Sequence, residues 1–431
     1  MWLLAWPVML SNISQPLLGL VDTAVIGHLS QSLYLAAVAI GTTIFSFIYW
    51  SFGFLRMGTT GVIAQSVGGE DGAKNRTVLA QSLVLALAIA CVLLVLQTPI
   101  IEFALTLMAP QPELLEEARS YAQIRIYGAP AVLCNYVLLG WFVGNQNTRV
   151  LLILLVVTNL INIVLDVLAV TVLGWKTQGL AIATVISEYA GVCLALWYCR
   201  AMLVKVPGSV VMEQLKRFSA YLPLLSVNRY LFVRTVLLLL AMSFFTAQGA
   251  AQGVDTLAAN ALLMTFVMLL SYGLDGFAHA IEALAGKAIG ARNLDAFYSL
   301  TRAAALGSVL MALVFSAFFW LFGPLLIDLL TSIEAVRNLA ALYLPWVVLI
   351  PLLAVVSYLL DGVFIGTTQV RTMQWAMLVS VCGVYFPLWW LTQGLGNQGL
   401  WLSLCGLYVA RALTSVYGFY RLSAAGLWLK S

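Results

Sequence analysis

Twelve apolar stretches, each of roughly twenty residues or more, follow one another along the chain with short polar connections between them. About 20 apolar residues in a helix cross the ~30 Å hydrocarbon core of a bilayer. Hydrophobicity does not alternate within these stretches, as it would in the strands of a membrane barrel. The pattern predicts an all-α membrane protein with twelve transmembrane helices, at about 1–27, 33–68, 77–108, 119–144, 150–173, 178–202, 214–247, 256–290, 297–330, 336–366, 370–392 and 397–424.

The chain also contains an internal repeat. The segment GWFVGNQNTR, from Gly140 to Arg149, returns 222 positions later as GVFIGTTQVR, from Gly362 to Arg371. Further pairs recur at spacings of 216 to 222: Pro7 and Pro223, Asn12 and Asn228, Leu35 and Leu257, Pro130 and Pro351, and Gln178 and Gln398. Such self-similarity indicates a gene duplication.

The repeat predicts two lobes, an N-lobe at 1–210 with helices 1–6 and a C-lobe at 211–431 with helices 7–12. Because six crossings is an even number, both lobes enter the membrane from the same side. They are then related by a pseudo-twofold axis along the membrane normal, as in parallel-repeat transporters, with a central cleft between them.

Composition and charge agree with a membrane location. Hydrophobic residues make up 62% of the chain and charged residues 9%, against about a quarter charged in soluble domains. Thirteen basic residues of the connections lie on the side of the first residue: Lys74, Arg76, Arg149, Arg200, Lys205, Lys216, Arg217, Lys287, Arg292, Arg302, Arg371, Arg421 and Lys430. Three lie on the opposite side: Arg119, Lys176 and Arg337. This excess predicts cytoplasmic termini in a bacterial-type inner membrane, and it accounts for the net charge of +4 without a nucleic-acid partner.

The sequence lacks the motifs of ATP-driven and hydrolytic chemistry. It has no Walker loop, no HExxH and no GxSxG, and it has only two histidines. The six cysteines lie in apolar stretches without metal-ligand spacing. We therefore expect neither an enzyme nor a cofactor or metal, and we expect transport to be driven by an ion gradient.

Four polar residues of the first half are predicted to share one depth in the membrane, where ionisable groups are costly and mark function. Asp22 lies ~8 Å from the outer end of the first helix, and Asp166 lies ~10 Å from the outer end of the fifth. Asn162 is one turn deeper than Asp166, and Thr184 lies ~9 Å into the sixth helix. Together they predict a proton- or cation-coupling site.

Further polar residues continue these faces inward. Gln15 and Ser11 precede Asp22 by 7 and 11 positions, Asn159 precedes Asn162 by 3, and the fourth helix adds Asn135. Polar stripes cannot face lipid cheaply, so they are predicted to line a substrate cavity. Individual amides and hydroxyls can equally serve helix packing, because small polar residues bond across helices.

The second half lacks this set. At the repeat spacing, Asp22 falls on Leu238 and Thr184 on Leu404, and Asp166 falls within 386–388, which holds no acid. The contrast suggests that ion coupling belongs to the first lobe.

Two carboxylates in a poorly hydrated cavity do not both ionise readily, so one of them is expected to carry a proton. Pro7, fifteen residues before Asp22, removes a backbone hydrogen bond and predicts a hinge in the first helix. A proline tolerated in the cytoplasmic first turn explains Pro7 equally well.

Other charges within the apolar stretches mix both signs, which favours internal ion pairs. They are Arg56, Glu188, Arg229, Arg234, Asp275, His279, Glu282, Asp361 and Arg411. Asp361 is the exception, because it adjoins the duplicated Gly362-x-x-x-Gly366 segment and is also a candidate for a second cation site or a cytoplasmic gate. The two Gly-x-x-x-Gly segments themselves predict close helix packing.

Several of these features together resemble the multidrug and toxic compound extrusion (MATE) family, in its DinF branch. They are Pro7, the segment DTAVIGH from Asp22, the Asn162-x-x-x-Asp166 pair and the segment QGLAIAT ending at Thr184. The resemblance implies export of lipophilic, often cationic compounds by a lobe-rocking antiport cycle. It also implies that the proton binds at the residues matching Asp22, Asn162, Asp166 and Thr184, and that the first helix bends at Pro7.

Two alternatives to a monomeric, proton-coupled exporter remain open. The related NorM branch has a second-lobe cation site with a carboxylate on helix 7, where this chain has Arg229 and Arg234 and no acid. Sodium could still bind the first-lobe oxygens, since carboxylates, amides and hydroxyls are ligands for hard cations. A flippase for lipid-linked amphiphiles would need a basic groove, whereas the predicted first-lobe cavity is acidic or neutral.

Overall fold

The computed structural model describes residues 2–12, 32–108 and 111–429. In these ranges the chain is helical and contains no strand, as predicted. Eleven of the described helical spans are long and apolar enough to cross a membrane. The predicted first helix, 1–27, is described only over residues 2–12, which are helical.

Contacts divide the chain into two compact units. The N-unit is Leu10–Leu224, and the C-unit is Met1–Met9 together with Leu225–Ser431. Residues 1–9, which we assigned to the N-lobe, thus group with the second half. The reason is packing, because Ala5 and Met9 form a small buried cluster with Phe277 and Ala280.

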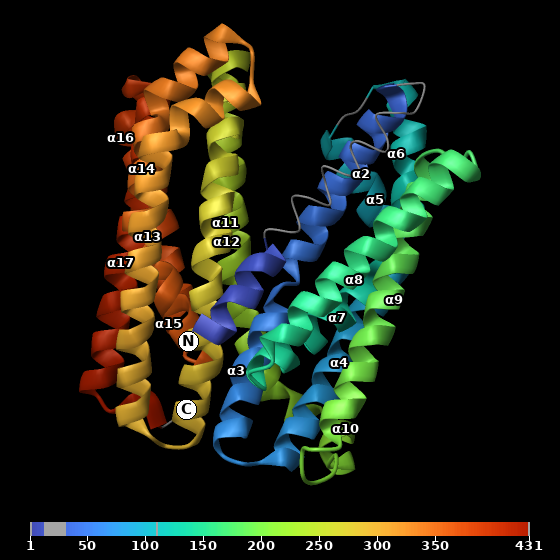
Figure 1. The fold of residues 1–431 in the computed structure, drawn as a ribbon, viewed down its shortest axis with the longest axis vertical. Helices are drawn as coiled ribbons and strands as arrows, with labels where there is room; N and C mark the ends of the chain where they lie inside the picture. Colours follow the sequence, from blue (N-terminus) through green and yellow to red (C-terminus); the bar gives the residue numbers. More distant parts are fainter. Residues whose placement is uncertain (1, 13–31, 109–110, 430–431) are drawn as a thin grey trace. The chain divides into compact units, whose positions relative to one another are not determined.

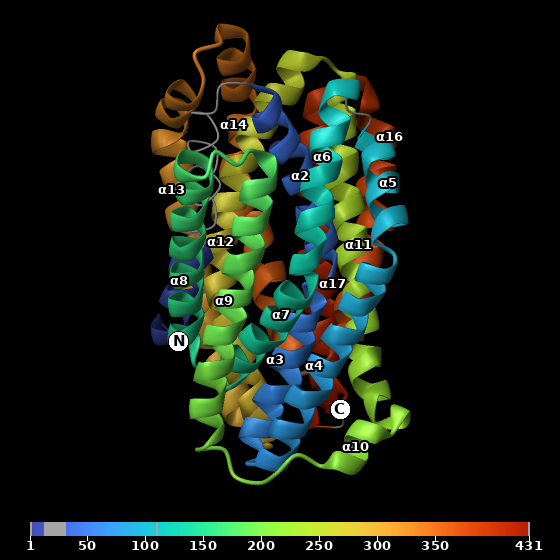
Figure 2. The same ribbon diagram turned by 90° about the vertical axis from the view of Figure 1, so that its right-hand side faces the viewer.

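In its described residues the N-unit is a bundle of helices that lie side by side (Figures 1 and 2). Its α-helices are α2 (Ser32–Ser51), α3 (Phe54–Gly68), α4 (Gly72–Val95), α5 (Gln97–Met108), α6 (Pro112–Arg125), α7 (Ala129–Gly144), α8 (Thr148–Val167), α9 (Thr177–Leu203) and α10 (Met212–Lys216). Short 3-10 helices occupy Ile126–Gly128 and Phe218–Tyr221, and a π-helical segment occupies Leu168–Val172.

The C-unit is also built of helices. They are α11 (Leu222–Ala251, which starts just before the unit boundary), α12 (Val254–Gly290), α13 (Leu294–Leu330), α14 (Glu334–Gly366), α15 (Val370–Leu378), α16 (Phe386–Thr392) and α17 (Asn397–Ala424). A π-helical segment, Val379–Tyr385, joins α15 to α16, and 3-10 turns occupy Gln393–Leu395 and Leu427–Leu429.

Several predicted spans are interrupted, and three of the breaks lie in the first half of the chain. The span 33–68 breaks at Phe52 and Gly53, between α2 and α3, and Gly53 is the N-cap residue of α3. The span 77–108 breaks at Leu96, three residues before Pro99. A 3-10 turn separates α6 from α7, whose first turn contains Pro130. A proline fits the first turn of a helix but not its interior, so the second and third breaks follow from local sequence.

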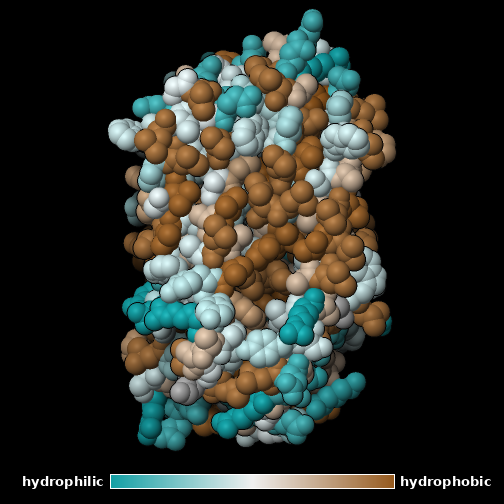
Figure 3. Space-filling model, turned by 90° about the vertical axis from the view of Figure 1, so that its left-hand side faces the viewer, coloured by the Kyte–Doolittle hydropathy of each residue, from teal (hydrophilic) through white to brown (hydrophobic). Residues whose placement is uncertain are grey.

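The outer surface suits a bilayer. Figure 3 shows a broad hydrophobic band across one face of the molecule, with hydrophilic side chains gathered toward both ends. Four large apolar residues of α13 are each at least half exposed: Leu310, Leu313, Val314 and Trp320. Large apolar side chains in such positions are stable against lipid rather than water.

The duplicated glycines bring helix backbones together. In the N-unit, a Cβ on Gly140 would overlap the carbonyl oxygen of Arg56, and one on Gly144 would lie 2.9 Å from the carbonyl oxygen of Thr60. Glycine is therefore required for α7 to approach α3 this closely, and the predicted close packing is confirmed.

The C-unit repeats this contact between α14 and α12. A Cβ on Gly362 would overlap the carbonyl oxygen of Ala278, and one on Gly366 would overlap that of Glu282. Arg56 with Ala278, and Thr60 with Glu282, are again 222 positions apart. The duplication is thus present in the packing as well as in the motif.

Candidate functional site

Three of the four predicted coupling residues lie in the described part of the N-unit. Asn162 of α8 donates a 3.5 Å hydrogen bond to the Thr184 hydroxyl of α9, which itself donates to the Leu180 carbonyl oxygen at 2.8 Å. Asp166 follows Asn162 by one turn of α8. The side chains of Asn162 and Asp166 are 2% and 1% exposed. The structure therefore joins α8 to α9 through two of the predicted residues and buries a carboxylate beside them.

The predicted cavity residues are placed less uniformly. Asn159 and Asn135 are half-buried, on α8 and α7 respectively. The side-chain amide oxygen of Asn135, Oδ1, accepts no hydrogen bond from the described residues. Its amide nitrogen lies 3.5 Å from where a Cβ on Gly191 would be, so α7 and α9 also meet closely here.

The contributions of the first helix are described only in part. Pro7 lies inside the helical stretch 2–12 and is buried, and Ser11 is also buried. Asp22 and Gln15 lie outside the described residues. The meeting of Asp22 with Asp166 and the hinge at Pro7 therefore stay predictions.

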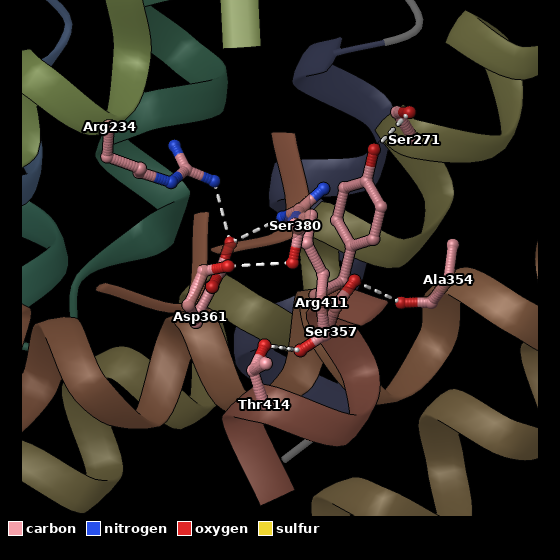
Figure 4. Close-up of polar contacts among 10 residues, drawn as sticks. Arg234, Ser271, Ala354, Ser357, Asp361, Ser380, Arg411 and Thr414 are labelled. Atoms are coloured by element: carbon pink, nitrogen blue, oxygen red, sulfur yellow. Dashed lines mark hydrogen bonds and ion pairs between the residues drawn. The ribbon is translucent and has the colours of Figure 1, made fainter. Parts of the chain in front are cut away.

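Asp361 of the C-unit is an ion-pair centre. Arg234 of α11 and Arg411 of α17 both donate to its Oδ2 atom, at 2.6 and 2.8 Å (Figure 4). The Arg411 guanidinium also lies 5.7 Å from the centre of the Tyr358 ring. The side chains of Arg234, Arg411 and Asp361 together carry a net charge of +1.

A positively charged cluster repels a further cation, most strongly where water is scarce. The two arginine contacts oppose a further cation beside Asp361, and the second cation site and the cytoplasmic gate both stay predictions. The contacts of Arg234 and Arg411 with Asp361 agree with the internal ion pairs predicted from the mixed charges of the apolar stretches.

A second buried ion pair lies in the N-unit. Arg125, at the end of α6, makes two hydrogen bonds with Glu188 of α9, 2.8 Å from Nη1 to Oε2 and 2.6 Å from Nη2 to Oε1. Sequence reasoning identified Glu188 as a buried charge but missed Arg125, which lies within the predicted helix 119–144. A carboxylate inside the membrane needs a basic partner, and this need is the sequence signal that could have identified Arg125.

Comparison with known proteins identifies the family. Residues 7–168 and 232–391 both match the family model described as MatE. The chain belongs to the MatE family. The two matched stretches correspond to the two halves of the repeat, and membership of this family makes the protein a transporter rather than an enzyme.

Two curated relatives and one group of solved structures illustrate the range of the MatE family. DNA damage-inducible protein F of Escherichia coli K12 is 44% identical over 99% of this chain and 93% of its own length. Protein DETOXIFICATION 44, chloroplastic, of Arabidopsis thaliana is 26% identical over 99% of this chain and 82% of its own length. Crystal structures of a MATE protein in bent and straight conformations superpose with TM-scores of 0.90 and 0.89, at 22% identity, over 99% of this chain and 96% of theirs. The MATE resemblance and the DinF branch are confirmed, and the solved structures support the fold.

Proposed function

We propose that this MatE protein is a proton-coupled antiporter that exports lipophilic, often cationic compounds from the cytoplasm. The observation that carries the proposal is the buried Asp166 carboxylate beside the Asn162–Thr184 hydrogen bond. A carboxylate changes from acceptor to donor when it takes a proton, so its uptake of a proton must rearrange such a network. A relative of Listeria monocytogenes, 22% identical, carries the name probable multidrug resistance protein NorM, which supports drugs as the substrate class.

Two features favour a proton over sodium as the coupling ion. A proton binds the buried Asp166 carboxylate directly, whereas a sodium ion needs several oxygen ligands arranged around it. In the C-unit, the two guanidiniums on Asp361 oppose a cation there.

The proposed cycle uses the first helix as its switch. Protonation of Asp22 or Asp166 from the outer side favours a bend at Pro7, where one backbone hydrogen bond is already missing. A bent first helix reduces the N-lobe cavity and releases substrate, which gives the opposite movement of proton and drug that antiport requires. The protein acts as a monomer in the inner membrane with both termini in the cytoplasm, and it needs no cofactor.

The test is efflux of a fluorescent lipophilic cation from everted vesicles, with proton and sodium gradients imposed separately. We expect the proton gradient alone to drive transport, and we expect Asp166→Asn to abolish it at unchanged expression. Asp328→Asn is the matched control, because Asp328 is an exposed carboxylate near the end of α13. Transport driven by sodium alone, or normal transport by Asp166→Asn, would contradict the proposal.

A further inference from the structure

The Arg125–Glu188 pair lies away from both ends of the two membrane-spanning segments that hold it, Pro112–Gly144 and Thr177–Leu203. Arg125 is 13 residues into the 33-residue span Pro112–Gly144. The two side chains are only 12% and 14% exposed. Isolated charges at such a depth are strongly unfavourable, and the two-fold hydrogen bonding of guanidinium and carboxylate is the geometry that offsets this cost best.

The surrounding backbone is shaped to admit the pair. The 3-10 turn Ile126–Gly128 follows Arg125 directly, and a Cβ on Gly128 would overlap Oε2 of Glu188. The Arg125 guanidinium lies 5.7 and 5.6 Å from the ring centres of Phe45 and Tyr49, within the range of cation–π attraction. The Tyr49 hydroxyl donates to the Arg125 carbonyl oxygen at 3.2 Å. Three helices and a turn thus converge on one ion pair.

The second half of the duplication shows that the fold does not need this pair. At the spacing of 221 or 222 that relates Pro130 and Gly140 to their copies, Arg125 falls on Trp346 or Val347. At the spacing of 220 that relates Gln178 to Gln398, Glu188 falls on Tyr408. Val347 and Tyr408 belong to one buried hydrophobic cluster, and Trp346 packs against it. Apolar packing therefore fulfils the same structural role in the C-unit, and apolar replacement of buried ion pairs is often neutral or stabilising.

Helix α9 connects the pair to the coupling site. Glu188 follows Thr184 by four residues, so both side chains lie along one side of α9. Thr184 contacts Asn162 of α8, whereas Glu188 contacts Arg125 of α6. Helix α9 is thus held at two successive turns, once against α8 and once against α6.

We propose that Arg125 and Glu188 are positioning residues for ion coupling. They hold α9 in the register that keeps Thr184 within reach of Asn162, and their balanced charges set the electrostatic environment in which the N-unit takes up its proton. This inference rests on the proposed proton coupling. It adds to the predicted site a charged pair one turn further inward.

The charges around the pair decide the sign of the test. Among the described residues, the titratable groups that interact electrostatically with the pair are Tyr49 of α2, Tyr121 of α6, Tyr136 of α7 and Tyr189 of α9. Arg56 of α3 in turn interacts with Tyr136. The tyrosines are neutral at the working pH, and Arg56 is present in every variant. Glu188→Gln therefore leaves Arg125 as an added positive charge, whereas Arg125→Gln leaves Glu188 as an added negative one.

The two single variants are expected to move the pH midpoint of efflux in opposite directions. Asp166 lies one turn outward of Asn162 and Glu188 one turn inward of Thr184, which separates them by ~12 Å along the helices. A net charge at that distance, with an effective dielectric constant of ~20, shifts the midpoint by roughly one pH unit. Glu188→Gln should shift it to lower pH, because a positive charge opposes proton uptake. Arg125→Gln should shift it to higher pH.

The double variant R125V/E188Y tests positioning without adding net charge, since it installs the residues of the second repeat. We expect its melting temperature to stay within about 5 °C of the wild type and its efflux to fall at least tenfold at every pH. Equal midpoints for the wild type and both single variants, or normal efflux by the double variant, would overturn the inference. If the double variant does not fold, the two midpoints decide alone.

A readout independent of transport separates this inference from the proposed function. The purified protein is titrated from acid to alkaline pH while its tryptophan fluorescence is followed. Absence of proton-driven efflux in the wild type would refute the proposed function. The opposite shifts of the fluorescence midpoint in the two single variants would still test the role of the pair.

Discussion

Replacing Asp361 with asparagine should destabilise the C-unit more than removing one of its arginine partners. In the wild type the three side chains carry a net charge of +1 and are 12%, 10% and 4% exposed for Asp361, Arg234 and Arg411. Asp361→Asn leaves two buried guanidiniums without the carboxylate to which both of them donate. Breaking a buried pair in this way costs about 3–5 kcal/mol. For a unit of this size, that corresponds to a melting temperature lower by about 6–20 °C.

Arg234→Gln has a smaller expected effect because Arg411 and Asp361 remain as a balanced pair. Its cost is the loss of one charge-assisted hydrogen bond, about 1.5–3 kcal/mol. The triple variant R234M/D361L/R411M removes every charge and should melt close to the wild type, since apolar side chains of similar volume replace buried ion pairs without loss.

Thermal unfolding in detergent, followed with a thiol-reactive fluorogenic dye, measures these differences. Cys405 of α17 is buried and free, so it reports opening of the C-unit. The charge argument predicts the order triple variant, Arg234→Gln, Asp361→Asn, from most to least stable. An Arg234→Gln protein as unstable as Asp361→Asn would refute it, because removing one guanidinium would then be as harmful as removing the carboxylate that both guanidiniums share.

Two further predictions concern the helix contacts and the first helix. Gly366→Ala places a methyl group against a backbone carbonyl and should lower the free energy of unfolding by about 1–3 kcal/mol. Gly394→Ala is the control and should be neutral, because no atom lies within 4 Å of the position of its Cβ. Equal melting temperatures of the two variants would contradict the close packing. Pro7→Ala restores the missing backbone hydrogen bond. We therefore expect proton-driven efflux to slow at least threefold, while the fluorescent substrate binds as tightly as before. Efflux at the wild-type rate would exclude a hinge at Pro7.

The spans and the glycine contacts were predictable because they depend on short-range pattern. The length of an apolar run determines whether a helix crosses a membrane, and the spacing of Gly140 and Gly144 places both on one helix face. The Asn162–Thr184 contact was also predictable, because neighbouring antiparallel helices bring residues of equal depth together. Each of these inferences needs only the sequence distance from a helix end.

Contacts that depend on the rotation of one helix about another were not predictable. The distance of Arg125 from the helix ends does not reveal that it faces Glu188, since many residues share that depth. The grouping of residues 1–9 with the C-unit depends on Met9 meeting Phe277, which is more than 260 positions away. Depth is encoded locally, whereas the choice of partner emerges from the packed bundle.

The paired glycine contacts have an evolutionary consequence. Because α7 meets α3, and α14 meets α12, through backbone atoms, each interface constrains two glycines and leaves most neighbouring side chains free to vary. After duplication, one copy of the scaffold was therefore able to keep or acquire charged groups such as Asp166 and Glu188 while the other became apolar at the matching positions. Division of labour between the two halves required no new architecture, only substitutions at positions that the glycine contacts do not constrain.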